Sequence, residues 1–254
     1  YYAIDSLPQH TIYAPKTITP GLKIPVLVWG NGGCLNVGTI MAPFLIQLAS
    51  QGVLVIANGP PADPNAAGTF ASFGAAGQAK PTAMGDSLTW VAANAGKGNW
   101  THVDGTRIAA AGQSCGGGDV YRVATDPRVS VLGIFNSGTM GGLVQGKVEG
   151  FAKPIFYFLG GPSDIAYKNG KGDYAKLAPE VVSWLGNWAK TGHGGTYNEM
   201  NGGEYGVAAS RWVNWVLRGD TSQAAWFTSG GAEKDGWTEV THRNMDKFKA
   251  PAKI

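Results

Sequence analysis

The segment at residues 107–125 constrains the fold of this chain more than any other. Residues 107–111 have the pattern of a short strand and lead without a break into Gly112-Gln113-Ser114-Cys115-Gly116. Residues 115–125 can then form a helix, so that a strand, a glycine-flanked turn and a helix follow one another. A strand that passes directly into a helix is typical of sheets with parallel strands. The segment therefore predicts an α/β fold.

The remainder of the chain repeats this alternation. Residues 24–29 form an apolar, β-branched run that ends in Gly30-Asn31-Gly32-Gly33, as expected for a buried strand that leaves a sheet through a glycine loop. We expect one domain over residues 1–254, with a mostly parallel central sheet flanked by helices. Further strands are predicted at residues 53–57, 129–135, 154–159 and 181–188, and helices at residues 37–51, 82–95 and 205–217.

Charge and hydropathy exclude two classes of partner. Charged residues make up 15% of the chain and the formal net charge is +3, without the basic stripe that a nucleic-acid-binding protein needs. Lys247, Lys249 and Lys253 are expected to be a solvated tail. No apolar run reaches the length of about 20 residues that a membrane span requires. We therefore expect neither a nucleic-acid partner nor a membrane.

Ser114 is the candidate nucleophile, because a strand-to-helix turn lifts a serine hydroxyl above the edge of a sheet. Gly117 and Gly118 follow in the first helical turn, where each weakens the helix by about 1 kcal/mol. Close backbone packing is the expected reason for this cost. Taken alone, the pentapeptide also fits a glycine-rich turn that carries an ordinary surface serine, so the choice depends on partner residues elsewhere in the chain.

A serine at such a turn needs an acid and then a histidine later in the chain. This order leaves His193 and His242, of which His193 lies in a glycine-rich loop after the last predicted parallel strand and is preferred as the base. Asp164 is the expected acid, because it follows a buried strand run, and Glu149 is the second choice. The short spacing between these residues leaves no room for a large cap domain.

The predicted chemistry also needs backbone N–H donors for a developing oxyanion. Cys115 is expected to supply one donor, and Gly33 or Cys34 the other. Two donors on one oxygen cannot be more than about 6 Å apart, which is within reach of a disulfide. We therefore predict a disulfide between Cys34 and Cys115, the only two cysteines. The alternative is a pair of buried free thiols, which an intracellular location would favour.

Two further features concern the surface. The long loop at residues 60–78 contains Phe70 and Phe73, which either line a pocket or anchor the loop to the core. Asn99-Trp100-Thr101 is an N-glycosylation sequon. Together with the nine tryptophans and the start at Tyr1, the sequon favours a secreted glycoprotein, although a trimmed chain would begin in the same way.

Several blocks of the chain resemble a group within the α/β-hydrolase superfamily that is related to dienelactone hydrolases and to cutinase-like polyester hydrolases. The resemblance implies an α/β-hydrolase fold with Ser114 as nucleophile, Asp164 as acid and His193 as base. It names no substrate, and dienelactone hydrolases use a cysteine where this chain has Ser114. The matching blocks lie at residues 29–34, 112–117, 136–138, 163–166, 193–197 and 201–203.

The leading expectation is a monomeric serine esterase that acts on a small-molecule or polymeric ester without a cofactor or metal. Two alternatives stay open, since a fold does not fix a function. The first is a hydrolase-type site reused for lyase, isomerase or cyclase chemistry on a biosynthetic intermediate. The second is a non-catalytic binding module, which three catalytic residues in the right order disfavour. Formation of an acyl-enzyme from a generic ester separates these possibilities.

Overall fold

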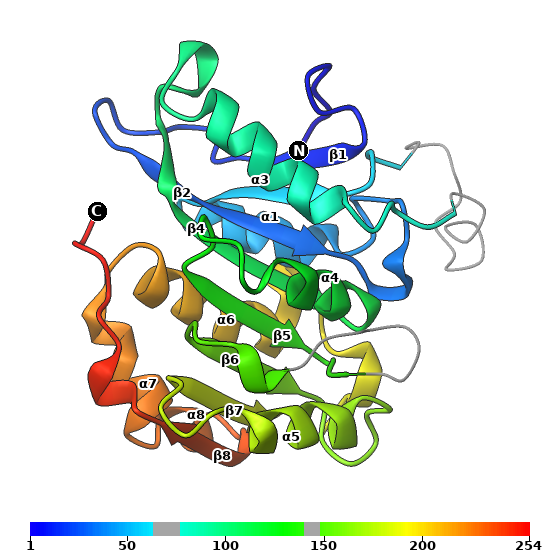
Figure 1. The fold of residues 1–254 in the computed structure, drawn as a ribbon, viewed down its shortest axis with the longest axis vertical. Helices are drawn as coiled ribbons and strands as arrows, with labels where there is room; N and C mark the ends of the chain where they lie inside the picture. Colours follow the sequence, from blue (N-terminus) through cyan, green and yellow to red (C-terminus); the bar gives the residue numbers. More distant parts are fainter. Residues whose placement is uncertain (63–76, 140–147) are drawn as a thin grey trace.

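The computed structural model describes residues 1–62, 77–139 and 148–254. Its core is one sheet of eight strands (Figure 1). In chain order they are β1 (His10–Tyr13), β2 (Ile24–Gly30), β3 (Leu54–Asn58), β4 (Val103–Gln113), β5 (Val131–Phe135), β6 (Ile155–Leu159), β7 (Ser183–Asn187) and β8 (Thr238–Arg243). Their order across the sheet is β1-β3-β2-β4-β5-β6-β7-β8.

The six inner strands are parallel, and an antiparallel strand closes each edge. β1 pairs with β3, and β8 pairs with β7, in antiparallel register. Every residue of β2 and β3 is buried, as expected for strands that are covered on both faces and consist of continuous apolar runs. The predicted α/β fold with a mostly parallel sheet is therefore confirmed, whereas the two edge strands were not predicted.

Helices cover both faces of the sheet. In Figure 1, α3 (Ala83–Asn94), α4 (Cys115–Val123) and α5 (Tyr167–Lys176) lie in front of it, and α1 (Ala42–Ser50) and α6 (Gly203–Val216) lie behind it. The rear face continues with the short helices α7 (Ala224–Thr228) and α8 (Gly231–Lys234). Each face has its own apolar core, and the rear core is rich in aromatic rings, with Trp29, Phe135, Phe158 and Trp212 among them. The sheet is thus the middle of three layers.

Most predicted elements agree with the structure to within a few residues. The largest differences are at α1, which was predicted from residue 37 but begins at Ala42, and at β4, which extends beyond the predicted residues 107–111 at both ends. Pro43 lies in the first turn of α1, where its missing N–H and fixed φ are tolerated. The apolar residues Ile40 and Met41 therefore precede the helix and are available to line a surface.

The strand order places a crevice at the carboxyl ends of β2 and β4. From β2 the chain moves to β3 on one side and then returns to β4 on the other side. Ligands of open α/β sheets bind at such a switch point, outside the carboxyl ends of the strands. The segments that leave this edge carry Gly32 after β2, Ser114 after β4, Asn136 after β5, Asp164 after β6 and His193 after β7.

Candidate active site

Ser114 occupies the apex of a sharp turn between β4 and α4. Its φ of 52° and ψ of −121° lie in a region that non-glycine residues rarely adopt. β4 ends at Gln113 and α4 begins at Cys115, so the turn consists of Ser114 alone. The Ser137 hydroxyl donates to the Ser114 carbonyl at 2.6 Å and supports the turn from the loop after β5. This is the strained strand-to-helix geometry that the sequence predicts.

Close packing explains the glycines around Ser114. Gly116 lies against Gly30 at the end of β2, and a Cβ on Gly116 would overlap the Gly30 carbonyl group. A Cβ on Gly117 would overlap the Ser137 side chain in the same way. The start of α4 therefore packs closely on its surroundings. A tight backbone contact is found at Gly116, whereas Gly117, for which it was predicted, meets the Ser137 side chain.

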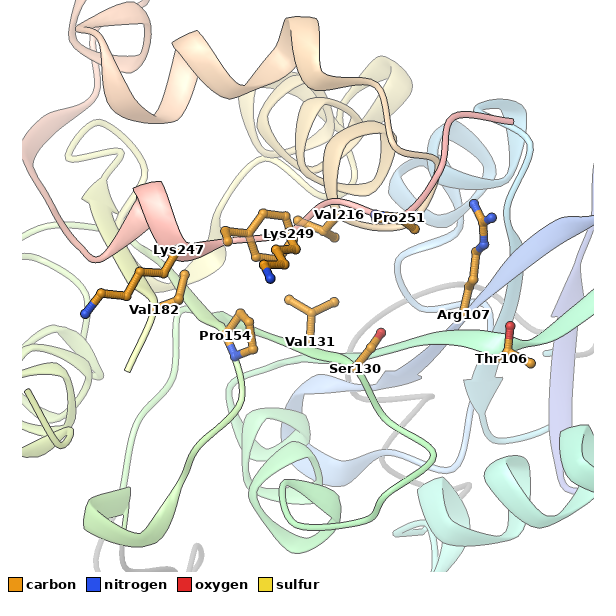
Figure 2. Close-up of a pocket in the computed structure, with 11 residues that line it drawn as sticks. Thr106, Arg107, Ser130, Val131, Pro154, Val182, Val216, Lys247, Lys249 and Pro251 are labelled. Carbon is orange, nitrogen blue, oxygen red and sulfur yellow. The ribbon is translucent and has the colours of Figure 1, made fainter. Parts of the chain in front are cut away.

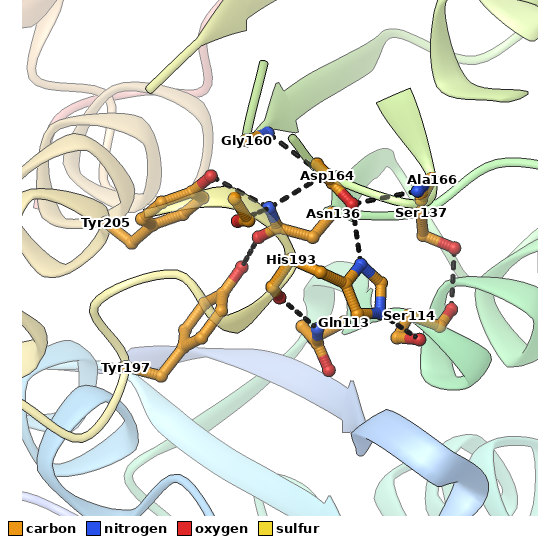
Figure 3. Close-up of polar contacts among 11 residues, drawn as sticks. Gln113, Ser114, Asn136, Ser137, Gly160, Asp164, Ala166, His193, Tyr197 and Tyr205 are labelled. Carbon is orange, nitrogen blue, oxygen red and sulfur yellow. Dashed lines mark hydrogen bonds and ion pairs between the residues drawn. The ribbon is translucent and has the colours of Figure 1, made fainter. Parts of the chain in front are cut away.

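His193 lies between Ser114 and Asp164, in a short 3-10 helix after β7 (η4, Gly192–Gly194). Figure 3 shows its Nε2 facing the Ser114 hydroxyl at 2.9 Å and its Nδ1 facing Asp164 Oδ1 at 2.6 Å. The Gln113 amide donates to the His193 carbonyl at 3.1 Å and ties this loop to the end of β4. The structure thus brings together the three residues selected from the sequence.

The Asp164 side chain is fully buried, with 0% of it exposed. Burial raises the pKa of a carboxyl group, but the hydrogen bonds that Asp164 accepts outweigh this effect and hold its pKa below the ordinary value. The group is therefore ionised, so His193 Nδ1 carries a proton and Nε2 accepts from the Ser114 hydroxyl. The donors to Asp164 are His193 Nδ1 at 2.6 Å, Ala166 N at 2.8 Å, Asn136 Nδ2 at 2.9 Å and Gly160 N at 3.0 Å.

Asn136 also belongs to the candidate site, although the sequence pointed to it only as part of the matching block at residues 136–138 and assigned it no role. It is completely buried after β5, with a φ of 43°. Besides Asp164, its amide nitrogen lies 3.1 Å from the Gly192 carbonyl and 2.9 Å from the Tyr205 hydroxyl, and its amide oxygen accepts from the Tyr197 hydroxyl (Figure 3). Asn136 therefore holds both the acid and the loop that carries His193. A possible signal was its position directly after a strand, because asparagine tolerates left-handed backbone better than most residues.

The disulfide between Cys34 and Cys115 is present, with Cα atoms 5.1 Å apart, so this prediction is confirmed. It joins the loop after β2 to the first residue of α4. The Cys115 N–H lies at the start of a helix, where it has no acceptor within the helix. The Cys34 N–H already donates to the Asn31 carbonyl at 3.2 Å. Gly33 is therefore favoured over Cys34 as the second candidate oxyanion donor.

A cavity of about 410 Å³ opens beside Ser114 and His193. Ile40 and Met41 form a buried apolar wall, with 8% of each residue exposed. The exposed residues Gly33, Gly194 and Asn198 also line it. The volume is within the range of about 300–1,000 Å³ that is usual for small-molecule sites.

The other residues considered in the sequence analysis lie elsewhere. His242 is exposed on β8, where it pairs with Trp184, and Glu149 is exposed in a short 3-10 helix (η3, Val148–Gly150). Asn99 lies in a different 3-10 helix (η2, Gly98–Trp100) and is exposed, as a glycan acceptor must be. Phe70 and Phe73 lie outside the described residues.

A second hollow, of about 240 Å³, lies at the amino ends of the parallel strands, opposite the carboxyl ends that carry Ser114 (Figure 2). Ser130, Pro154 and Val182 line it, and these residues directly precede β5, β6 and β7. Arg107 at its border is already used, because it pairs with Asp104 at 3.1 Å and donates to the Ala252 carbonyl at 2.7 Å. The hollow therefore has no part in the chemistry at Ser114.

Within the described residues, neither a metal site nor a membrane-spanning helix gives a further indication of function. Within residues 1–62, 77–139 and 148–254, no group of three or more His, Cys, Asp or Glu side chains is placed to hold a metal ion. No helix in the described part of the chain is long and apolar enough to cross a membrane. No model of a known protein family matches the chain, and no curated protein matches it.

Proposed function

We propose that this protein is a serine hydrolase that cleaves carboxylic esters through an acyl-enzyme on Ser114. The observation that carries the proposal is the continuous hydrogen-bonded line from Ser114 Oγ through the His193 ring to the buried Asp164 carboxylate, with distances of 2.9 and 2.6 Å. Such an arrangement activates a serine hydroxyl, which is a weak nucleophile on its own.

The proposed reaction proceeds in two halves. In the first, Ser114 Oγ attacks the ester carbonyl carbon while His193 Nε2 takes the hydroxyl proton. The tetrahedral oxyanion accepts hydrogen bonds from the N–H groups of Cys115 and Gly33, and its collapse expels the alcohol, which receives the proton from His193. In the second half, His193 Nε2 takes a proton from water, which attacks the acyl carbon. The bond from this carbon to Ser114 Oγ then breaks, His193 returns the proton to Oγ, and the carboxylic acid leaves. Asp164 stays ionised and stabilises the imidazolium in both halves.

The finer assignment, an α/β-hydrolase related to dienelactone hydrolases and cutinase-like enzymes, is part of the proposal. The mostly parallel sheet and the position of Ser114 at the switch point support it. A secreted, N-glycosylated form is proposed on two grounds, the Cys34–Cys115 disulfide and the exposed sequon at Asn99.

A serine-directed fluorophosphonate and a 4-nitrophenyl ester test the proposal together. The reagent should add one adduct to the peptide that contains Ser114, and Ser114→Ala should abolish both the adduct and the ester turnover. His193→Ala should do the same, whereas His242→Ala, at an exposed position on β8, should change neither. An adduct on another serine, or turnover that survives Ser114→Ala, would contradict the proposal.

A further inference from the structure

We propose, on the basis of the ester hydrolysis proposed above, that the natural substrate is an uncharged ester whose acyl chain binds against Ile40 and Met41. The cavity that contains Ser114 and His193 carries this inference, because the character of its walls decides which groups can replace water there.

The apolar wall adjoins the reacting centre. The terminal methyl group of Met41 lies 3.6 Å from the position that a Cβ on Gly32 would occupy. Gly32 directly precedes Gly33, the proposed oxyanion donor. An ester carbonyl bound there would therefore have the methionine side chain close to one of its two substituents, which we assign as the acyl chain. Ile40 extends the same wall.

Within the described part of the chain, the polar groups that line the cavity do not offer a partner for a charged substrate. Apart from His193, none of the described lining residues ionises in the usual pH range. The Gln113 amide nitrogen is used within the protein, since it donates to the His193 carbonyl, and the amide oxygen lies beside Gly32. Asn198 is neutral and lies exposed at the opening.

A carboxylate in the acyl chain would consequently lose water without gaining a cation. Burial of an unpaired charge is costly, and the ionised Asp164 behind His193 adds repulsion. An ammonium group would meet the same apolar wall, because His193 stands between the cavity and Asp164. A neutral acyl chain has neither cost and gains from contact with Ile40 and Met41.

Three 4-nitrophenyl esters with the same six-carbon acyl chain test this proposal. They are the hexanoate, the monoester of adipic acid, which ends in a carboxylate, and the 6-aminohexanoate, which ends in an ammonium group. We expect kcat/KM for the hexanoate to exceed both others by about 100-fold, the ratio that corresponds to roughly 3 kcal/mol of unfavourable charge burial. Ser114→Ala supplies the blank for spontaneous hydrolysis.

Substitution of Met41 in the apolar wall gives a second comparison, between a charged and a neutral side chain at the same position. Met41→Lys should raise the ratio of adipate to hexanoate turnover at least tenfold, because it places a cation beside the acyl chain, whereas the neutral Met41→Leu should keep the wild-type ratio. Circular dichroism of each variant checks that it is folded. The wild-type comparison stands even where Met41→Lys does not fold.

The outcomes separate the two proposals. Equal kcat/KM for the hexanoate and the adipate, with the fluorophosphonate adduct still on Ser114, would overturn the substrate class and leave the esterase proposal intact. Absence of turnover for all three esters together with absence of the adduct would overturn both.

Discussion

Removal of the Cys34–Cys115 disulfide, by Cys34→Ala and Cys115→Ala together, should lower both stability and turnover. The cysteines are 81 residues apart in sequence. In the chain-entropy model, opening a loop of that length lowers the free energy of unfolding by about 4.5 kcal/mol at 25 °C. For a chain of 254 residues this corresponds to a Tm lower by roughly 8–9 °C.

The same bond links the two segments that carry the proposed oxyanion donors, at Gly33 and Cys115. Complete loss of one donor costs about 3 kcal/mol, or roughly 100-fold in kcat. The loop after β2 would keep other restraints, because the buried Asn31 amide donates to the carbonyls of Val37 at 2.9 Å and Asn58 at 2.6 Å. We therefore expect a partial loss, of roughly tenfold in kcat, with a smaller change in KM.

Calorimetry and ester turnover at 20 °C, well below both melting temperatures, measure the two effects separately. Wild-type protein in a phosphine reductant should behave like the double variant, and the reductant should not change the double variant further. An unchanged Tm would refute the loop-closure reasoning. A lower Tm with full kcat in the folded variant would refute the link between the disulfide and the oxyanion donors.

Three further predictions concern separate parts of the site and its surroundings. Ser114→Ala, His193→Ala and Asp164→Asn should each lower kcat by several orders of magnitude, and combining them should not add their effects, because the three act as a unit; kinetics of single and double variants decides this. Asn136→Asp should lower kcat more at high pH than at low pH relative to wild-type, because only a protonated carboxyl can donate to Asp164; a kcat that is lower by the same factor at every pH would count against a role for Asn136 in holding the acid. Burial raises the pKa of Asp119 to about 6, above its ordinary 3.8, although Arg122 and the Asn58 hydrogen bond lower it, so the folded state loses stability as pH rises from about 4 to 6. Asp119→Asn should therefore raise the free energy of unfolding by up to about 3 kcal/mol at pH 8 and by little at pH 4, as denaturation at the two pH values would show.

The central part of the fold could be predicted because its local pattern and its tertiary environment agree. Residues 24–29 and 53–57 are continuous apolar runs, and the structure buries both in the middle of the sheet. β8 is different, since five of its six residues are polar, most are exposed, and only one neighbour, β7, supplies its hydrogen bonds. Its β-branched residues favour a strand, but a single apolar residue gives no alternation from which a strand could be predicted. β1, with four residues, is too short for a periodic pattern to be detected.

The candidate active site could be predicted only in part, for the same physical reason. The order Ser114, Asp164, His193 could be found because parallel strands bring their carboxyl ends to one edge, so residues after successive strands must lie close together. Asn136 also follows such a strand, but an amide becomes important only through the groups around it, here Asp164 and the Gly192 carbonyl. Those groups lie 28 and 56 residues away along the chain, and no local pattern records them. A serine in a glycine-flanked pentapeptide can be selected as a candidate from five residues and weighed by the acid and histidine that follow it in the chain, whereas a residue that orients the acid can be recognised only when the three strands that hold it are seen together.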